Sequence, residues 1–68
     1  MKKNNLIQER KESGWTQAFV AQHLGIKQAH YCLIENGKRD PSMKVLKGLE
    51  ELFGKPYDYL LSSMEDES

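Results

Sequence analysis

The chain has 68 residues, a formal net charge of zero and one cysteine, Cys32. This length predicts a single domain with a small core, which dimerisation or a partner would help to stabilise. A lone thiol excludes a disulfide framework or a metal site and fits a reducing cytoplasm. The sequence predicts neither a secretion signal nor a membrane span of roughly 20 apolar residues.

The charge is divided unevenly along the chain. Residues 1–39 contain seven Lys or Arg and three Asp or Glu residues, whereas residues 40–68 contain three and seven. This division is expected where one face of a domain meets phosphate and another does not. Solvated surface charges would give the same counts, so both interpretations stay open.

The pattern of apolar residues predicts five helices and no strands, which is an all-α fold. The first helix is expected over about residues 5–12, with Leu6 and Arg10 on its inner face and Asn4 or Asn5 as its cap.

The second helix is expected over residues 17–23, because Thr16 suits an N-cap. Phe19, Val20 and Leu24 recur behind it at helical spacing, which predicts an apolar inner face.

A tight turn is expected at Gly25, where a helix needs a residue that tolerates positive φ. A further helix should cover residues 28–35, with Tyr31 and Ile34 facing the core. Two short helices crossed at such a turn form a helix-turn-helix, whose second helix can lie in the major groove of DNA.

Ser42 is the expected cap of a helix over residues 43–53, with Leu46, Leu49 and Phe53 inward. Pro56 should open a last helix over residues 57–61, because its fixed φ suits a first turn. The expected organisation is one domain over residues 1–61, followed by a short acidic tail at residues 62–68.

Several short motifs lie in a specific order and spacing. They read Leu6-x-x-x-Arg10-x-x-x-Gly14-x-Thr16-Gln17, Val20-Ala21-x-x-Leu24-Gly25-Ile26, Ile34-Glu35-Asn36-Gly37-Lys38-Arg39 and Pro41-Ser42-x-x-x-Leu46. This arrangement resembles the lambdoid phage repressor and Cro family of helix-turn-helix proteins, also called the xenobiotic response element (XRE) family. The resemblance implies a compact five-helix, lambda-repressor-like domain that binds operator DNA, usually as a two-fold dimer.

Four residues of the helix at 28–35 should face outward. Gln28 can pair with the N6 and N7 atoms of adenine, and Ala29 can touch a thymine methyl group. Cys32 is interpreted as a small groove-facing side chain rather than a redox switch. Leu33 departs from the family pattern, and three roles stay open for it: thymine contact, packing, or contact with a protein partner.

Six further residues are candidate contacts to the DNA backbone, and for His30, Lys38 and Arg39 a solvated surface position is the alternative. Lys27 takes the N-cap position of the recognition helix, where a phosphate could bind. His30 is a second phosphate candidate on the same helix. For the other four residues the resemblance implies the contacts to the DNA backbone; they are Gln17, Asn36, Lys38 and Arg39.

Other residues are assigned to structure or to a dimer. The resemblance implies an internal ion pair between Arg10 and Glu35, and we expect Trp15 to pack rather than to stack on a base. Glu50 is expected to be partly exposed at an interface. The residues expected to form a dimer surface are Tyr59, Leu60, Leu61 and Met64.

These observations and the resemblance favour a sequence-specific regulator of transcription. The expected protein is a homodimeric repressor, such as a prophage repressor, a restriction–modification controller or an antitoxin, from a bacterium or phage. Its partner would be double-stranded, palindromic operator DNA. No catalytic constellation is present in the sequence, so no enzyme activity and no cofactor are expected. The alternative is a protein-interaction module, since Tyr31, Cys32 and Leu33 make the middle of the recognition helix apolar.

Overall fold

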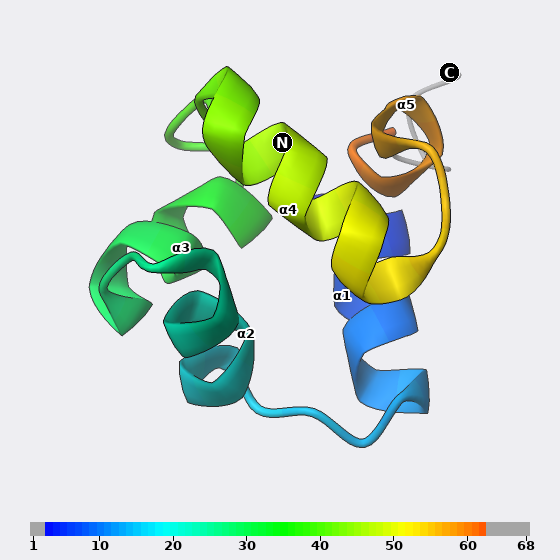
Figure 1. Ribbon diagram of the computed structural model, residues 1–68, viewed down its shortest axis with the longest axis horizontal. Helices are drawn as coiled ribbons and strands as arrows, with labels where there is room; N and C mark the ends of the chain where they lie inside the picture. Colours follow the sequence, from blue (N-terminus) through cyan, green and yellow to red (C-terminus); the bar gives the residue numbers. More distant parts are fainter. Residues whose placement is uncertain (1–2, 63–68) are drawn as a thin grey trace.

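The computed structural model describes residues 3–62, and five helices lie within them. No strand occurs in this range, so the predicted all-α, five-helix fold is confirmed, and each helix end lies within one residue of its predicted position. The helices in Figure 1 are α1 (Asn4–Glu12), α2 (Gln17–Leu24), α3 (Gln28–Glu35), α4 (Met43–Phe53) and α5 (Tyr57–Leu60).

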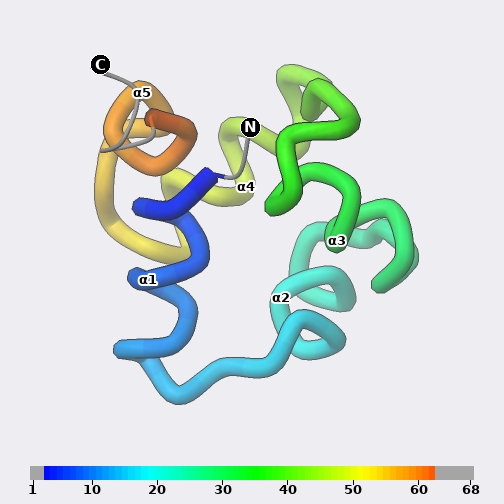
Figure 2. Tube along the Cα trace, turned by 180° about the vertical axis from the view of Figure 1, so that it is seen from behind, coloured from blue at the N-terminus to red at the C-terminus, as the bar shows by residue number. Residues whose placement is uncertain are grey.

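The helices form two groups that α4 joins. Figures 1 and 2 show α2 and α3 together on one side of the molecule, and α1 and α5 together on the other. Helix α4 packs against both α2 and α5. Gly48 lies where α4 approaches α2, since a Cβ atom at this position would come within 2.6 Å of Leu24 Cδ2. Helix α4 therefore joins the helix-turn-helix to the α1–α5 side of the domain.

One apolar core lies between the helices. Its buried members come from all five helices; they are Leu6, Val20, Ala21, Leu24, Tyr31, Ile34, Val45, Leu49 and Leu60. Two predictions about the core were wrong. Phe19 is 45% exposed, because Val20, Ala21 and Leu24 occupy the inner face of α2. In α4 the buried pair is Val45 and Leu49, whereas Leu46 is only half-buried.

Phe19 instead joins a cluster of three aromatic side chains at the edge of the core. The ring of Trp15 lies 5.3 Å from the ring of Phe19 and 5.3 Å from that of Phe53, centroid to centroid. Tilted aromatic pairs at this distance are favourable contacts. Trp15 therefore packs within the domain, as the sequence predicted.

The predicted signals at the ends of α2 and α4 are confirmed. Thr16 Oγ1 accepts a hydrogen bond of 3.0 Å from the amide of Phe19, and Ser42 Oγ accepts one of 3.3 Å from the amide of Val45. Gly25 ends α2 with φ of 75°, a left-handed conformation that glycine adopts without a steric penalty.

The start of α1 differs from its prediction. Lys3 takes the N-cap position, so neither Asn4 nor Asn5 caps the helix. Asn5 is instead buried, and its Nδ2 donates a hydrogen bond of 3.0 Å to the carbonyl oxygen of Tyr59. This side chain joins α1 to α5, because a buried amide needs a hydrogen-bond partner.

The start of α5 is capped by a residue of α4. Pro56 occupies the N-cap position and has no side chain that can accept a hydrogen bond. Glu50 supplies the acceptor: its Oε2 lies 3.0 Å from the amide nitrogen of Tyr57. The half-buried Glu50 thus stabilises the α4–α5 corner within one chain, a role that the sequence prediction of an interface residue did not include.

We expect Glu50→Ala to lower the free energy of unfolding by about 1 kcal/mol, because it removes this cap. Urea unfolding followed by circular dichroism measures the change. Glu51→Ala is the matched control, because Glu51 is exposed and its substitution removes the same charge from the same helix. Equal midpoints for the two variants would contradict the capping role.

Candidate nucleic-acid interface

Helix α3 has one face in the core and one face in solvent. Tyr31 and Ile34 are fully buried, which fixes the orientation of the helix. Gln28 and Ala29 are exposed in its first turn, and Leu33 is 39% exposed one turn further on. The residues predicted to face outward therefore do so, except that Cys32 is half-buried.

The N-terminus of α3 is open toward solvent. Lys27 is the N-cap residue, its side chain makes no cap hydrogen bond, and the first turn of the helix contains no acidic residue. The first amide groups of a helix lack partners within the helix and carry a partial positive charge. Such an end is suited to bind an anion, and Lys27 adds a positive charge beside it.

Three exposed cations lie around α3. Lys27 precedes the helix, and Lys38 and Arg39 follow it. Within residues 3–62, none of the three makes an ion pair with a carboxylate. His30 is half-buried on the same helix. Their exposure is compatible with contacts to phosphate groups, which remain predictions.

An open groove of about 550 Å³ runs beside the outer face of α3. Its apolar lining includes Ile26, Ala29 and Leu33, and its charged lining includes Lys27 and Arg39. Ile26 also packs against the core. Ala29 and Leu33, four residues apart, lie on the same side of α3, and the sequence signal extends only to this pair.

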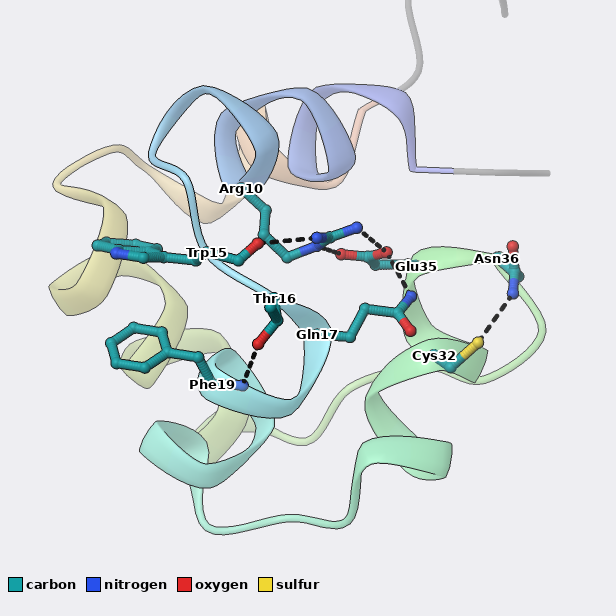
Figure 3. Close-up of polar contacts among 8 residues, drawn as sticks. All are labelled: Arg10, Trp15, Thr16, Gln17, Phe19, Cys32, Glu35 and Asn36. Atoms are coloured by element: carbon teal, nitrogen blue, oxygen red, sulfur yellow. Dashed lines mark hydrogen bonds and ion pairs between the residues drawn. The ribbon is translucent and has the colours of Figure 1, made fainter.

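A buried polar network joins the first three helices, as Figure 3 shows. Arg10 Nε donates to Glu35 Oε2 at 2.6 Å, and Arg10 Nη2 donates to Glu35 Oε1 at 3.3 Å. Arg10 Nη1 also donates to the carbonyl oxygen of Trp15 at 2.9 Å. The ion pair implied by the resemblance is therefore present, and it fixes α1 to α3.

Gln17 completes this network. Its Nε2 donates a hydrogen bond of 2.9 Å to Glu35 Oε1, so the start of α2 is joined to the end of α3 (Figure 3). One amide hydrogen of Gln17 is used in this contact. A glutamine amide carries a second hydrogen, and the phosphate contact expected of Gln17 remains a prediction.

The network also sets the protonation of its members. Burial alone would raise the pKa of Glu35, but hydrogen bonds from Arg10 and Gln17 outweigh burial, and the pKa lies below its ordinary value. The Tyr31 hydroxyl lies close enough to Glu35 to interact electrostatically, yet makes no well-formed hydrogen bond with any described residue. Burial raises the pKa of Tyr31, so its hydroxyl stays protonated at neutral pH.

The lowered pKa of Glu35 predicts a loss of stability in acid. The stabilisation is complete above the ordinary pKa of 4.5 and is lost as the pH falls through the lower folded-state pKa. We expect the free energy of unfolding to fall below pH 4.5, and to fall less steeply in Glu35→Gln, which cannot titrate. Urea unfolding at several pH values measures both slopes, and equal slopes would contradict this assignment.

Asn36 and Cys32 contact each other at the end of α3. Asn36 Nδ2 donates to Cys32 Sγ at 3.4 Å (Figure 3). This contact orients the Asn36 amide and uses one of its two hydrogens. The contact expected between Asn36 and the DNA backbone, and the position of Cys32 facing the DNA major groove, remain predictions.

The predicted dimer surface on α5 requires one correction. Leu60 is fully buried in the core of the single chain, so the prediction that it contacts a second copy was wrong. Tyr59 is 41% exposed, although its hydroxyl donates to Glu9 Oε2 at 3.4 Å. Leu61 is half-buried, and Met64 lies outside the described residues.

The arrangement of α2, the Gly25 turn and α3 defines a helix-turn-helix domain with an exposed second helix. A family model described as helix-turn-helix matches residues 6–60. The chain therefore belongs to the XRE-type helix-turn-helix family of DNA-binding proteins.

Three curated relatives come from Bacillus subtilis (strain 168). The chain is 36% identical over 61 residues to the HTH-type transcriptional regulator AnsR, covering 90% of this chain and 53% of AnsR. It is 44% identical over 54 residues to the uncharacterized HTH-type transcriptional regulator YqaF, covering 79% of this chain and 64% of YqaF. For the uncharacterized HTH-type transcriptional regulator YqaE the identity is 35% over 63 residues, covering 93% of this chain and 54% of YqaE.

The chain thus spans between about half and two thirds of the length of these relatives. No solved structure gives a significant match. Within residues 3–62, no helix has the length and apolar character needed to cross a membrane.

Proposed function

We propose that this protein is a non-enzymatic, sequence-specific regulator of transcription that acts in the bacterial cytoplasm as a homodimeric repressor. The single observation that supports this proposal best is the exposed face of α3. It presents Gln28, Ala29 and Leu33 on a helix whose orientation is fixed by the buried Tyr31 and Ile34. The names of the relatives, which are HTH-type transcriptional regulators, agree with this role.

In the proposed complex, each copy places α3 in the major groove of one operator half-site. Two copies related by a two-fold axis would read half-sites about 34–36 Å apart, which is one turn of DNA. Tyr59, Leu61 and Met64 remain the proposed dimer surface. Repression would result from blocking access of the polymerase to the promoter, as in a prophage repressor, a restriction–modification controller or an antitoxin.

Selection of bound duplexes from a random DNA pool tests this function. The full chain is used at about physiological salt, and the enriched duplexes are sequenced after several rounds. The proposal expects a palindrome with half-sites roughly one turn apart. Absence of any enriched sequence, with folding verified by circular dichroism, would overturn it.

We expect Gln28→Ala to weaken binding to the selected operator by about 1–3 kcal/mol per half-site and to relax the preference at one base position. The reason is the loss of a paired hydrogen bond to adenine. Equilibrium titration of labelled duplexes measures the effect. Gln8→Ala, an exposed glutamine on α1, is the matched control and should bind as the unaltered protein does. Equal affinities for the two variants would remove Gln28 from the base-reading residues.

The apolar groove beside α3 favours one alternative function, a protein-interaction module. The two functions differ in their response to salt. Binding to DNA weakens steeply as salt rises, because counterions are released from phosphates, whereas an apolar protein contact changes little.

A further inference from the structure

We infer that each operator half-site places thymine methyl groups in the groove beside α3, against Ala29 and Leu33. The inference rests on the proposed function, because it specifies which bases the same helix reads. It assigns Leu33 a role in specificity, where the sequence left three roles open.

The groove is lined by apolar side chains, by two exposed cations and by the half-buried His30. Ile26, Ala29 and Leu33 form the apolar part, and Leu33 keeps 39% of its surface exposed. Lys27 lines the groove just before α3, and Arg39 lines it beyond the end of the helix. Among residues 3–62, no acidic side chain lines this groove. Such a lining suits DNA, in which an apolar base substituent lies between negatively charged backbone phosphates.

The chemistry of the base edges selects thymine. In the major groove, guanine presents two acceptors and cytosine a donor, whereas thymine presents a methyl group. Ala29 and Leu33 have no side-chain hydrogen-bonding group, so they would leave the polar edges of a G·C pair without partners. An unsatisfied buried polar group is unfavourable, whereas burial of a methyl group is favourable.

The spacing along α3 is consistent with two such contacts. Ala29 and Leu33 are four residues apart, which corresponds to roughly 6 Å along the helix axis. Successive bases of one strand are about 3.4 Å apart, so the two side chains reach thymines within about two steps of each other. Gln28 precedes Ala29 in the same first turn and is placed to read an adenine beside them.

Replacement of thymine by uracil tests the inference, because uracil keeps the base pair and lacks only the methyl group. The full chain is titrated against the selected operator and against duplexes in which one thymine, with its symmetry mate, is replaced by uracil. We expect one or two positions at which affinity falls about 4-fold per methyl group, or about 15-fold for the symmetric pair.

Two variants of Leu33 connect this effect to the side chain. In Leu33→Ala and in Leu33→Gln, the uracil penalty at the affected position should shrink to less than about 2-fold, since the apolar contact is gone. Leu33→Gln has a similar helix propensity and provides a second test if Leu33→Ala folds poorly. Gln28→Ala is the control, in which the uracil penalty should persist.

The outcomes separate this inference from the proposed function. Specific operator binding with equal affinity for thymine and uracil duplexes would overturn the inference and leave the proposed function intact. A uracil penalty that persists in both Leu33 variants would also overturn it, because the methyl group would then act through DNA shape or another residue. Absence of specific binding by the folded chain would overturn both.

Discussion

Arg10→Ala is expected to lower the free energy of unfolding by about 3–5 kcal/mol. The substitution leaves the Glu35 carboxylate, which is 2% exposed, buried without its cation, and it also removes the donor to the carbonyl of Trp15. A domain of this size has only roughly 3–10 kcal/mol of stability, so much of the variant should be unfolded at 25 °C. Thermal and urea unfolding followed by circular dichroism measure the loss.

Lys11→Ala is the matched control for this variant. Lys11 is the next residue of α1 and is exposed, and its replacement by alanine removes the same charge. The free energy of unfolding of this variant should change by no more than about 0.5 kcal/mol. If Arg10→Ala kept the stability of the unaltered protein and lost affinity for DNA, Arg10 would be a DNA contact rather than part of the internal ion pair.

The double variant Lys38→Ala/Arg39→Ala is expected to have the largest effect on DNA binding. Both cations are exposed, and neither is paired with a carboxylate within residues 3–62. In the proposed dimer the variant would remove the four phosphate contacts that are expected of these cations, which should lower the slope of log K against log salt by about 3–4 units. At about 0.1 M salt this corresponds to an affinity loss on the order of 10³-fold.

Titrations at several salt concentrations measure this slope. Lys11→Ala/Lys47→Ala is the control, because it removes the same charge from exposed positions on α1 and α4. An unchanged slope for the first double variant would place Lys38 and Arg39 in the solvated loop, which was the alternative interpretation of these residues.

Local signals in the sequence were sufficient for much of the fold. Thr16, Ser42 and Gly25 act on amides or turns within a few residues of themselves, so their roles could be predicted without knowing the tertiary structure. The inward faces of α2 and α3 followed from the spacing of Val20, Leu24, Tyr31 and Ile34, all of which are buried.

The wrong predictions concern contacts between distant parts of the chain. Asn5 was expected to cap α1, but its partner is the carbonyl of Tyr59, 54 residues away. Leu60 was assigned to a dimer surface because the amount of apolar surface that the other helices bury could not be derived from the sequence. The cap that Glu50 provides for α5 could not be predicted either, because its partner, the amide of Tyr57, lies seven residues further along the chain.

The same reasoning applies to the candidate site. Exposure of Gln28, Ala29 and Leu33 followed from the helical period once Tyr31 was placed inside. The groove could not be predicted, because it depends on how Arg39, beyond the end of α3, lies relative to the Gly25 turn.

The hydrogen bond between Gln17 and Glu35 has a consequence for the entropy of DNA binding. A free glutamine side chain samples many rotamers, and immobilising such a side chain at an interface costs about 0.5–1.5 kcal/mol. In this domain the Gln17 side chain is already restrained by Glu35, which Arg10 holds in place. Most of that loss of freedom therefore occurs when the chain folds, and a phosphate that reaches the start of α2 meets a donor that is already oriented.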